Sequence, residues 1–111
     1  MERKDNNGTP VAVEKLADMV DYQSDSVVSR TLIKKDKGTV TLFAFEKDGA
    51  LSEHTAPFDA LVYVVEGKAE ITIAKKPYLL EAGETIILPA NRSHAVKATE
   101  RFKMLLTMIR A

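Results

Sequence analysis

The chain has 111 residues, 45% hydrophobic and 29% charged, a composition typical of one globular domain rather than of a disordered chain or two domains. Sixteen basic residues balance sixteen acidic ones, so no net charge attracts the chain to nucleic acid or to an anionic membrane surface. There are no cysteines, which excludes disulfides, cysteine-ligated metals, iron–sulfur clusters and thiol catalysis.

Residues 1–25 are expected to form an N-terminal tail and edge segment. The first residues are polar and lack the apolar core of a signal peptide, and no apolar run approaches the roughly 18 residues of a membrane span. We therefore expect a cytoplasmic protein with no membrane partner. Within residues 11–21, a short helix and an edge strand fit equally well, because the apolar residues are Val13, Leu16, Met19 and Val20.

From residue 26 onward, short β-branched and aromatic runs alternate with turn residues, and no helical period separates them. The predicted strands are residues 27–33, 39–45, 61–65, 69–74, 78–80, 85–88, 94–98 and 102–109. This rhythm predicts an all-β sandwich or barrel over residues 26–111. Gly67 lies between two apolar runs, where a tight hairpin would need the positive φ that glycine adopts most easily.

Two of these predicted strands carry apolar side chains on both faces. In residues 102–109, four residues line one face, while Leu105 and Ile109 make the other face partly apolar. Residues 39–45 are similarly mixed. A strand that is apolar on both faces is covered on both faces, and a second copy of the chain would supply that cover. We therefore expect a homodimer, with cover by a loop or by the N-terminal segment as the alternative.

The stretch that follows Gly49 has a distinctive spacing around the first of the two histidines. His54 is followed by one residue, then Ala56, three residues, Ala60, six residues and Gly67. A second spaced pattern begins further along the chain. Gly83 is followed by five residues, Pro89, one residue, Asn91, two residues, His94, three residues and Ala98.

Together these two patterns resemble the paired motifs of the cupins, and in particular the small single-domain bacterial cupins of the conserved barrel type. The resemblance covers about residues 26–110. It implies a double-stranded β-helix, which is a jelly-roll barrel of two facing antiparallel sheets. Asn91 stands where the second motif has a glycine, and asparagine is among the few other residues that tolerate a positive φ.

In metal-binding cupins, two histidines and a glutamate of the first motif converge with one histidine of the second on a single divalent ion. The resemblance places His54 and His94 at two of these ligand positions, and Ala56 and Ala60 at the two that are vacated. A divalent transition metal (Zn, Ni, Cu, Fe or Mn) would then have only two imidazole ligands, fewer than the three protein ligands usual for a catalytic zinc.

Other acids do not obviously replace the missing glutamate. Glu53 has outward parity, Glu66 is expected at the hairpin facing solvent, and Asp59 would reach the site only if the strand parity slipped near its loop. Three interpretations of the two histidines stay open: a degenerate site, a weak metal site completed by water or ligand, and a metal-free pocket. In the last, the imidazoles bind a small polar molecule or act on it as acid and base.

Strand parity also suggests which side chains line or close the cup beside the two histidines. They are Phe43, Phe45, Val62, Val64, Ile86, Leu88, Met104 and Leu106. Tyr63 has the opposite parity and is expected on an outer face. The leading hypothesis is a small-molecule-binding cupin of unassigned role, with an unidentified ligand. The alternative is a metal-dependent cupin enzyme, of dioxygenase or isomerase type, with a reduced two-histidine site. Whether the protein is an enzyme is left open.

Overall fold

The computed structural model describes residues 3–4 and 10–110. Its elements are β1 (Arg3–Lys4), β2 (Pro10–Val11), a 3-10 helix η1 (Leu16–Met19), β3 (Val27–Lys35), β4 (Gly38–Phe45), β5 (Ala50–His54), β6 (Asp59–Ile73), β7 (Lys76–Glu81), β8 (Thr85–Leu88), β9 (His94–Lys97) and β10 (Phe102–Ile109). The segment that the sequence left open between helix and edge strand thus contains a short strand and one helical turn. No helix in the described part of the chain is long and apolar enough to cross a membrane.

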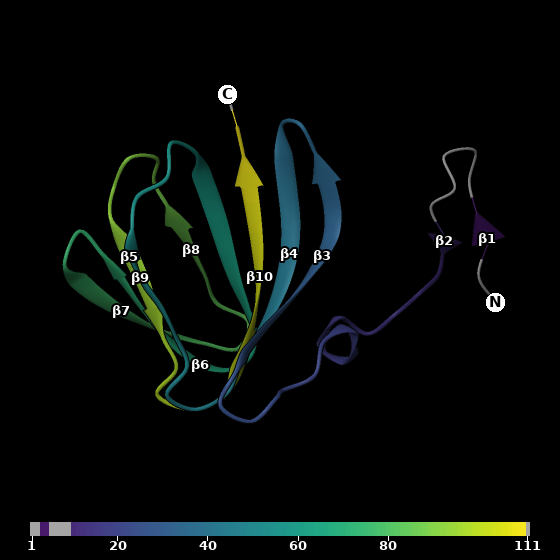
Figure 1. Cartoon of the computed structure of the whole chain (residues 1–111), viewed down its shortest axis with the longest axis horizontal. Coiled ribbons are helices and arrows are strands. Elements are labelled where there is room, and N and C mark those ends of the chain that lie inside the picture. The colour runs from purple at the N-terminus through teal and green to yellow at the C-terminus, as the bar shows by residue number, and fades with distance from the viewer. Residues whose placement is uncertain (1–2, 5–9, 111) are drawn as a thin grey trace.

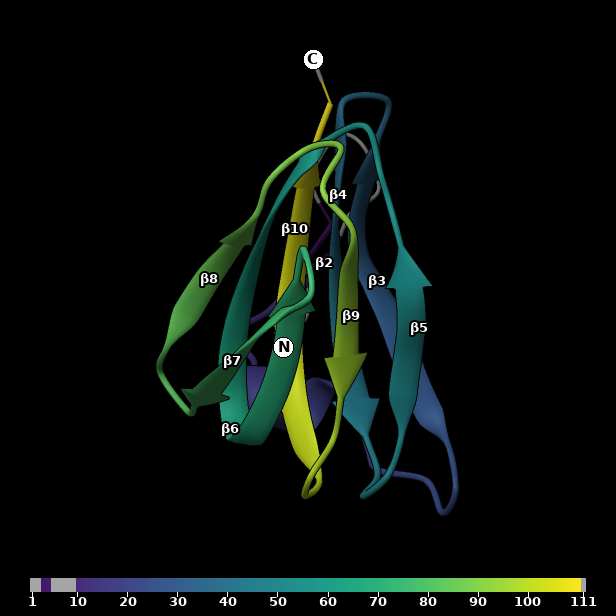
Figure 2. The same cartoon turned by 90° about the vertical axis from the view of Figure 1, so that its left-hand side faces the viewer.

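Strands β3 to β10 form two antiparallel sheets that share β6, and β1 pairs with β2 in a separate two-stranded sheet (Figures 1 and 2). The first sheet has the order β3-β4-β10-β6-β8 and uses the first half of β6, through Gly67. The second sheet has the order β5-β9-β6-β7 and uses the second half, from Lys68. In Figure 2 the second sheet lies nearest the viewer, with β10, β4 and β3 behind it. The predicted fold class, a jelly-roll barrel of two facing sheets, is confirmed.

The predicted hairpin at Gly67 is wrong. Residues 59–73 form one continuous strand, in which Gly67 has φ of +79° and pairs with Phe102. Close to Gly67, the register with β10 shifts between the pairs Glu66–Lys103 and Val64–Met104. A β-bulge of this kind bends a strand without ending it, and here it lets β6 pass from one sheet to the other. The positive φ was predicted correctly, but it serves a bend rather than a turn.

The hairpin that follows β6 lies earlier than its sequence signals indicate. The predicted strands 69–74 and 78–80 place the turn between them, yet Lys76 and Pro77 both belong to β7. The two-residue loop is instead Ala74-Lys75, with φ of +49° and +70°. Two successive positive φ values define the type I′ turn, which usually takes Asn-Gly. Within the barrel, β5 was not among the predicted strands.

The inner faces of the two sheets pack together into the main core. Phe45 and Phe102 lie at its centre, fully buried and stacked with ring centroids 4.5 Å apart. Burying one such side chain contributes about 1.5–3 kcal/mol relative to leaving it exposed. The rest of this cluster is aliphatic: Ala60, Val62, Val64, Ala69, Ile71, Ile73, Leu80, Leu88, Val96, Ala98 and Met104.

A second apolar cluster lies on the outer face of the first sheet. Leu42 and Ala44 are fully buried there by the chain's own N-terminal segment, through Val20. Apolar side chains that pack around them are Leu16, Met19, Tyr22, Val28, Leu32, Val65 and Leu105. Strands β4 and β10 therefore carry apolar side chains on both faces, as predicted. At this end of the sheet the outer face is covered by the N-terminal segment, which was the alternative to cover by a second chain.

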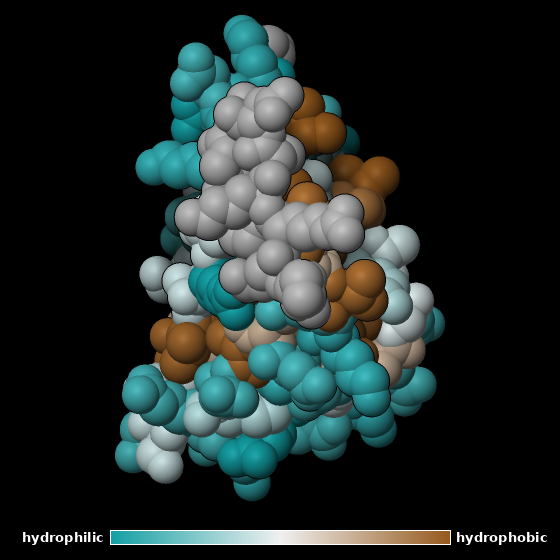
Figure 3. All heavy atoms as spheres, turned by 90° about the vertical axis from the view of Figure 1, so that its right-hand side faces the viewer, coloured by the Kyte–Doolittle hydropathy of each residue, from teal (hydrophilic) through white to brown (hydrophobic). Residues whose placement is uncertain are grey.

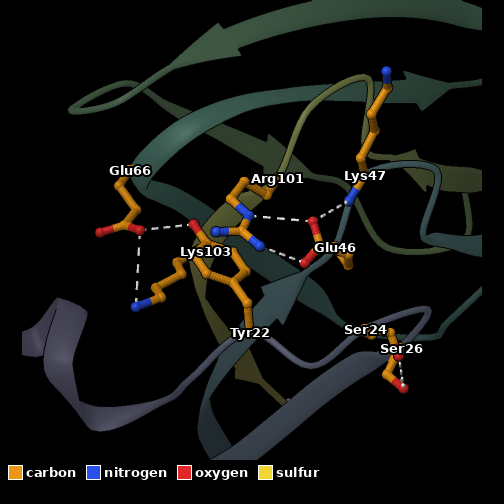
Figure 4. A network of polar contacts seen from close by, with 8 residues as sticks. All are labelled: Tyr22, Ser24, Ser26, Glu46, Lys47, Glu66, Arg101 and Lys103. Atoms are coloured by element: carbon orange, nitrogen blue, oxygen red, sulfur yellow. Dashed lines mark hydrogen bonds and ion pairs between the residues drawn. The ribbon is translucent and has the colours of Figure 1, made fainter.

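A polar cluster attaches this N-terminal segment to the barrel (Figure 4). The Tyr22 hydroxyl donates a 2.7 Å hydrogen bond to Glu66 Oε2, and the buried Lys103 donates from Nζ to the carbonyl of Ala17. Lys103 Nζ also lies 3.8 Å from the same Glu66 oxygen. Glu66, expected to face solvent, is instead an acceptor in this cluster. We call the group Tyr22, Glu66 and Lys103 the clasp.

Candidate functional site

The two histidines meet at one end of the second sheet. His54 is the last residue of β5 and His94 is the first residue of β9, and the antiparallel register places them directly opposite one another. Their ring centroids are 4.3 Å apart at 71°, an edge-on arrangement. The two Nε2 atoms approach to 3.1 Å. The structure thus brings together the two residues that the motif spacing had singled out.

The other ring nitrogens are held by the backbone in the same way. His54 Nδ1 lies 2.8 Å from the carbonyl oxygen of Ser52, and His94 Nδ1 lies 3.2 Å from that of Arg92. In each case the acceptor is two residues earlier in the chain. A carbonyl oxygen only accepts, so these contacts favour the tautomer with hydrogen on Nδ1. Each Nε2 is then left as a bare acceptor.

The two rings have different surroundings. His94 is buried, with 9% of its surface exposed, whereas His54 is exposed. Burial lowers the pKa of His94 below the usual imidazole range, and the charge of a protonated His54 lowers it further, although the Arg92 carbonyl opposes both effects. His94 is therefore the neutral acceptor of the pair near neutral pH.

Two loops position this end of the sheet. The Asn91 amide donates a 2.8 Å hydrogen bond to the carbonyl of Ala56, and the Ala90 amide donates to the Asp59 carboxylate at 2.9 Å. Asn91 has φ of +65°, as expected for a residue that replaces a motif glycine. The positive φ near the start of the first motif belongs to Asp48, at +71°, and not to its neighbour Gly49.

The donor set does not fit the three- or four-ligand metal centre that the resemblance implies. Asp59 is engaged with the Ala90 amide, Glu53 is exposed, and Glu66 belongs to the clasp. Across the described residues, no group of three or more His, Cys, Asp or Glu side chains is placed to hold an ion. Ala60 is buried among the core residues and offers only a methyl group.

The predicted cup residues all belong to the main core or pack against it. Phe45, Val64 and Met104 have at most 1% of their surface exposed, so they form the packed interior and present almost no surface to solvent. Phe43 is only partly buried and lies 5.9 Å from Phe45 between ring centroids. Other partly buried side chains at the edge of this core are Val27, Leu51, Ile86, Leu106 and Met108.

Sequence reasoning missed the two carbonyl groups that orient the histidines. Every residue has a backbone carbonyl, so Ser52 and Arg92 carry no signal of their own. The strand of the first histidine was also missed, because Ala50, Ser52 and Glu53 do not alternate clearly between apolar and polar. That strand supplies the register that sets His54 against His94.

Two facing sheets that share β6 define a double-stranded β-helix of the jelly-roll class. The paired histidines lie at one end of its second sheet. Residues 41–109 match the family model described as "Cupin domain". The chain belongs to this family, and the predicted resemblance is confirmed.

Solved structures that are similar to this chain support the same family assignment. A conserved protein of unknown function from Streptococcus pyogenes is 36% identical, with 96% of this chain and 93% of that chain covered and a TM-score of 0.88. A cupin superfamily protein from Desulfitobacterium hafniense is 28% identical over 86% and 88% of the two chains, with a TM-score of 0.83. A cupin 2 conserved barrel domain protein from Leptotrichia buccalis is 41% identical over 85% of this chain and 46% of that one, with a TM-score of 0.82. No curated protein matches the chain.

Proposed function

We propose that this cupin binds a small polar molecule, and that the Nε2 atoms of His54 and His94 are its anchor. The supporting observation is a shortage of hydrogens. Three contacts join the rings to each other and to the carbonyls of Ser52 and Arg92, and each contact needs one hydrogen. Two neutral imidazoles carry only two N–H groups. With hydrogen on both Nδ1 atoms, the neutral pair has two acceptors facing each other at 3.1 Å.

A hydrogen from outside the pair removes this conflict. It comes either from a proton shared by the two rings or from an O–H or N–H group of a ligand placed against both Nε2 atoms. Because the pKa of His94 is lowered, a proton shared by the two rings is disfavoured near neutral pH, and a hydrogen donated by a ligand is favoured. The ligand class is thus a small molecule with a hydroxyl, amine or similar donor.

The test uses two probes of similar size, benzyl alcohol, which has an O–H donor, and toluene, which has none. Ring ¹⁵N spectra of histidine report which nitrogens carry hydrogen, so each probe is titrated while the two Nε2 signals are followed. We expect benzyl alcohol to shift both signals, toluene to shift neither, and His54→Ala to abolish the response. Glu53→Ala, at an exposed neighbouring position, is the control that should respond like the wild type. Nε2 signals that respond equally to both probes, or to neither, would contradict the proposal.

The 3.1 Å separation of the two Nε2 atoms is also compatible with one alternative function, that of a metal-dependent enzyme with a reduced two-histidine site. Two imidazole nitrogens at about 2.0–2.1 Å from one ion and 3.1 Å from each other subtend an angle of roughly 100°, close to tetrahedral. Metal analysis of protein purified without chelator or affinity tag, followed by titration with Zn, Ni, Cu, Fe and Mn, distinguishes the two functions. Stoichiometric metal that is lost in His54→Ala and His94→Ala would favour the enzyme and overturn the metal-free pocket.

A further inference from the structure

The paired histidines belong to a row of residues that crosses the whole second sheet. His54 ends β5 and His94 begins β9, while Ile73 ends β6 and Lys76 begins β7. The register pairs His54 with His94, His94 with Ile73, and Ile73 with Lys76. Side chains that are paired directly across antiparallel strands project from the same face of the sheet. Lys76 therefore projects from the face that carries the imidazoles, at the same end of the sheet (Figure 2).

This face is the inner one, and it also carries Tyr78. Ile73 is buried in the main core, and Tyr78 pairs with Ile71, another core residue. Lys76 and Tyr78 are two residues apart on β7, so their side chains share a face. Lys76 Nζ lies 5.6 Å from the centroid of the Tyr78 ring, a cation–π contact. Both side chains are exposed, because β7 pairs only with β6 and is the edge of the sheet.

The acidic side chains of the same strands lie on the opposite face. Glu70 precedes the core residue Ile71, and Glu81 follows the core residue Leu80, so alternation directs both carboxylates outward. On the inner face of β9, of β7 and of the second half of β6, all of which the structure describes, Lys76 is the only Lys, Arg, Asp or Glu residue. No carboxylate of the described residues forms an ion pair with it.

The spacing suits one small molecule that contacts both ends of the row. Neighbouring strands are about 4.8 Å apart, so the backbone of Lys76 is roughly 10 Å from that of His94, and the apolar Ile73 lies between them. The long, flexible lysine side chain allows the ammonium group to approach a ligand held at the imidazoles. The acid next to His54, Glu53, is on β5, three strands away from β7.

The exposed apolar surface of the molecule gathers on a different face. Ile33, Ile87 and Ile109 are each more than half exposed and lie on the outer face of the first sheet. Figure 3 looks from the side of the N-terminal segment, and apolar surface is visible there beside the grey residues. The exposed end of the histidine row carries a cation instead, so it favours an anionic group over a purely apolar one.

We propose that Lys76 binds an anionic oxygen group, such as a carboxylate, of the same molecule whose hydroxyl or amine contacts the two imidazoles. This inference rests on the proposed function of the histidine pair, and it narrows the ligand class to small hydroxy or amino anions. The apolar middle of such a ligand lies over Ile73. The contact between Lys76 and the Tyr78 ring holds the ammonium group on the inner face, where the anion binds.

The test compares two probes of nearly the same shape, 4-(hydroxymethyl)benzoate and 4-(hydroxymethyl)benzamide, of which only the benzoate is charged. Both are titrated at pH 8, above the ordinary imidazole pKa of about 6.5, so that the imidazoles add no positive charge. The ring ¹⁵N signals of the two Nε2 atoms report binding. We expect both probes to shift these signals in the wild type, with a dissociation constant at least about fivefold lower for the benzoate. In Lys76→Met the two constants should become nearly equal.

Lys97→Met is the matched control. Lys97 is exposed on β9 and pairs with Glu70 on the outer face, so this variant removes the same charge from the same sheet and should keep the preference for the benzoate. Circular dichroism checks that each variant folds. Because the ammonium group is exposed, the preference should also weaken as salt is raised from about 0.05 to 0.5 M.

The outcomes separate this inference from the function on which it rests. If neither probe shifts the Nε2 signals of the wild type, the proposed function fails and the role of Lys76 fails with it. If both probes shift the signals with equal dissociation constants, the histidine anchor stands and the role of Lys76 is overturned. A preference that persists in Lys76→Met, or that Lys97→Met removes equally, also overturns it. Lys76 would then only protect an edge strand from pairing with other chains.

Discussion

The bend at Gly67 offers a sharp test of how β6 serves both sheets. Among the residues that the structure describes, two glycines have a similar positive φ, +79° at Gly67 and +89° at Gly83. Their surroundings differ completely. A Cβ atom added at Gly67 would clash with the carbonyl oxygen of Arg101 and lie 2.8 Å from Phe102 Cα, whereas one added at Gly83 would meet nothing within 4 Å. Replacing each by alanine therefore separates the backbone cost from the steric cost.

The expected magnitudes follow from these two terms. An L-residue in the left-handed region costs roughly 1–2 kcal/mol, and this cost applies to both positions. At Gly67 the nearest atoms in conflict are backbone atoms of Arg101 and Phe102, at the start of β10, which cannot rotate away, so the two strands must separate or the bend must open. Overpacking of a well-packed interior typically costs about 1–3 kcal/mol more. Gly67→Ala should therefore lose about 2–5 kcal/mol of unfolding free energy, and Gly83→Ala about 1–2 kcal/mol.

The measurement is urea unfolding followed by circular dichroism, at one fixed protein concentration so that any dimerisation affects all variants alike. A domain of this size has a total stability of about 5–15 kcal/mol, so both variants should remain measurable. Equal losses in the two variants would show that β10 does not approach Gly67 as closely as the structure has it. The bulge would then not be the feature that carries β6 between the sheets.

Three further changes probe the turn, the site and the clasp. Replacing Ala74 by Asn and Lys75 by Gly should raise the unfolding free energy by roughly 1 kcal/mol per residue, because both have positive φ in a two-residue turn that favours Asn-Gly; a loss of stability in urea would contradict this. The pKa of His94 is lowered in the folded state, so the unfolded state binds more protons below the usual imidazole pKa of about 6.5, and the unfolding free energy should fall as the pH drops from there toward 5. His94→Asn should reduce that slope, and an unchanged slope would remove His94 as its source. Tyr22→Phe removes the hydroxyl that donates to Glu66 and should cost about 1 kcal/mol and speed amide exchange in residues 16–22, whereas unchanged exchange would show that the clasp does not hold this segment.

Much of the barrel could be predicted from the sequence because its strands are locally consistent. In β10, Phe102, Met104, Leu106 and Met108 share one parity, and all four pack on the main core. The bend at Gly67 could not be read in the same way. A glycine between two apolar runs has the same local appearance whether the chain reverses or merely bends. Only the contact with Phe102, 35 positions further along the chain, distinguishes the two outcomes.

The clasp shows a second limit. Nothing near Glu66 in the sequence indicates a buried partner, since the acid stands between an apolar run and a glycine as a solvent-facing turn residue would. Its partners are Tyr22, far earlier in the chain, and Lys103, far later. Burial of the Tyr22 hydroxyl and its hydrogen bond to Glu66 raise the pKa of Tyr22 well above its ordinary value, so the hydroxyl remains a donor at a pH where an exposed tyrosine would ionise. Long-range polar contacts of this kind leave no periodic signal.

The site was half predictable for a related reason. Motif spacing placed His54 and His94 correctly, because a strand register converts sequence spacing into spatial position. It did not reveal that both Nδ1 atoms would be occupied by backbone carbonyls, and this detail changes the chemistry. Two histidines with free rings could choose the tautomers that join them by an ordinary hydrogen bond. Two histidines whose Nδ1 atoms both donate to carbonyls cannot do so while both are neutral. The proposal that this pair, with Ala56 and Ala60 at the other two ligand positions, binds a small polar molecule rests on that conflict.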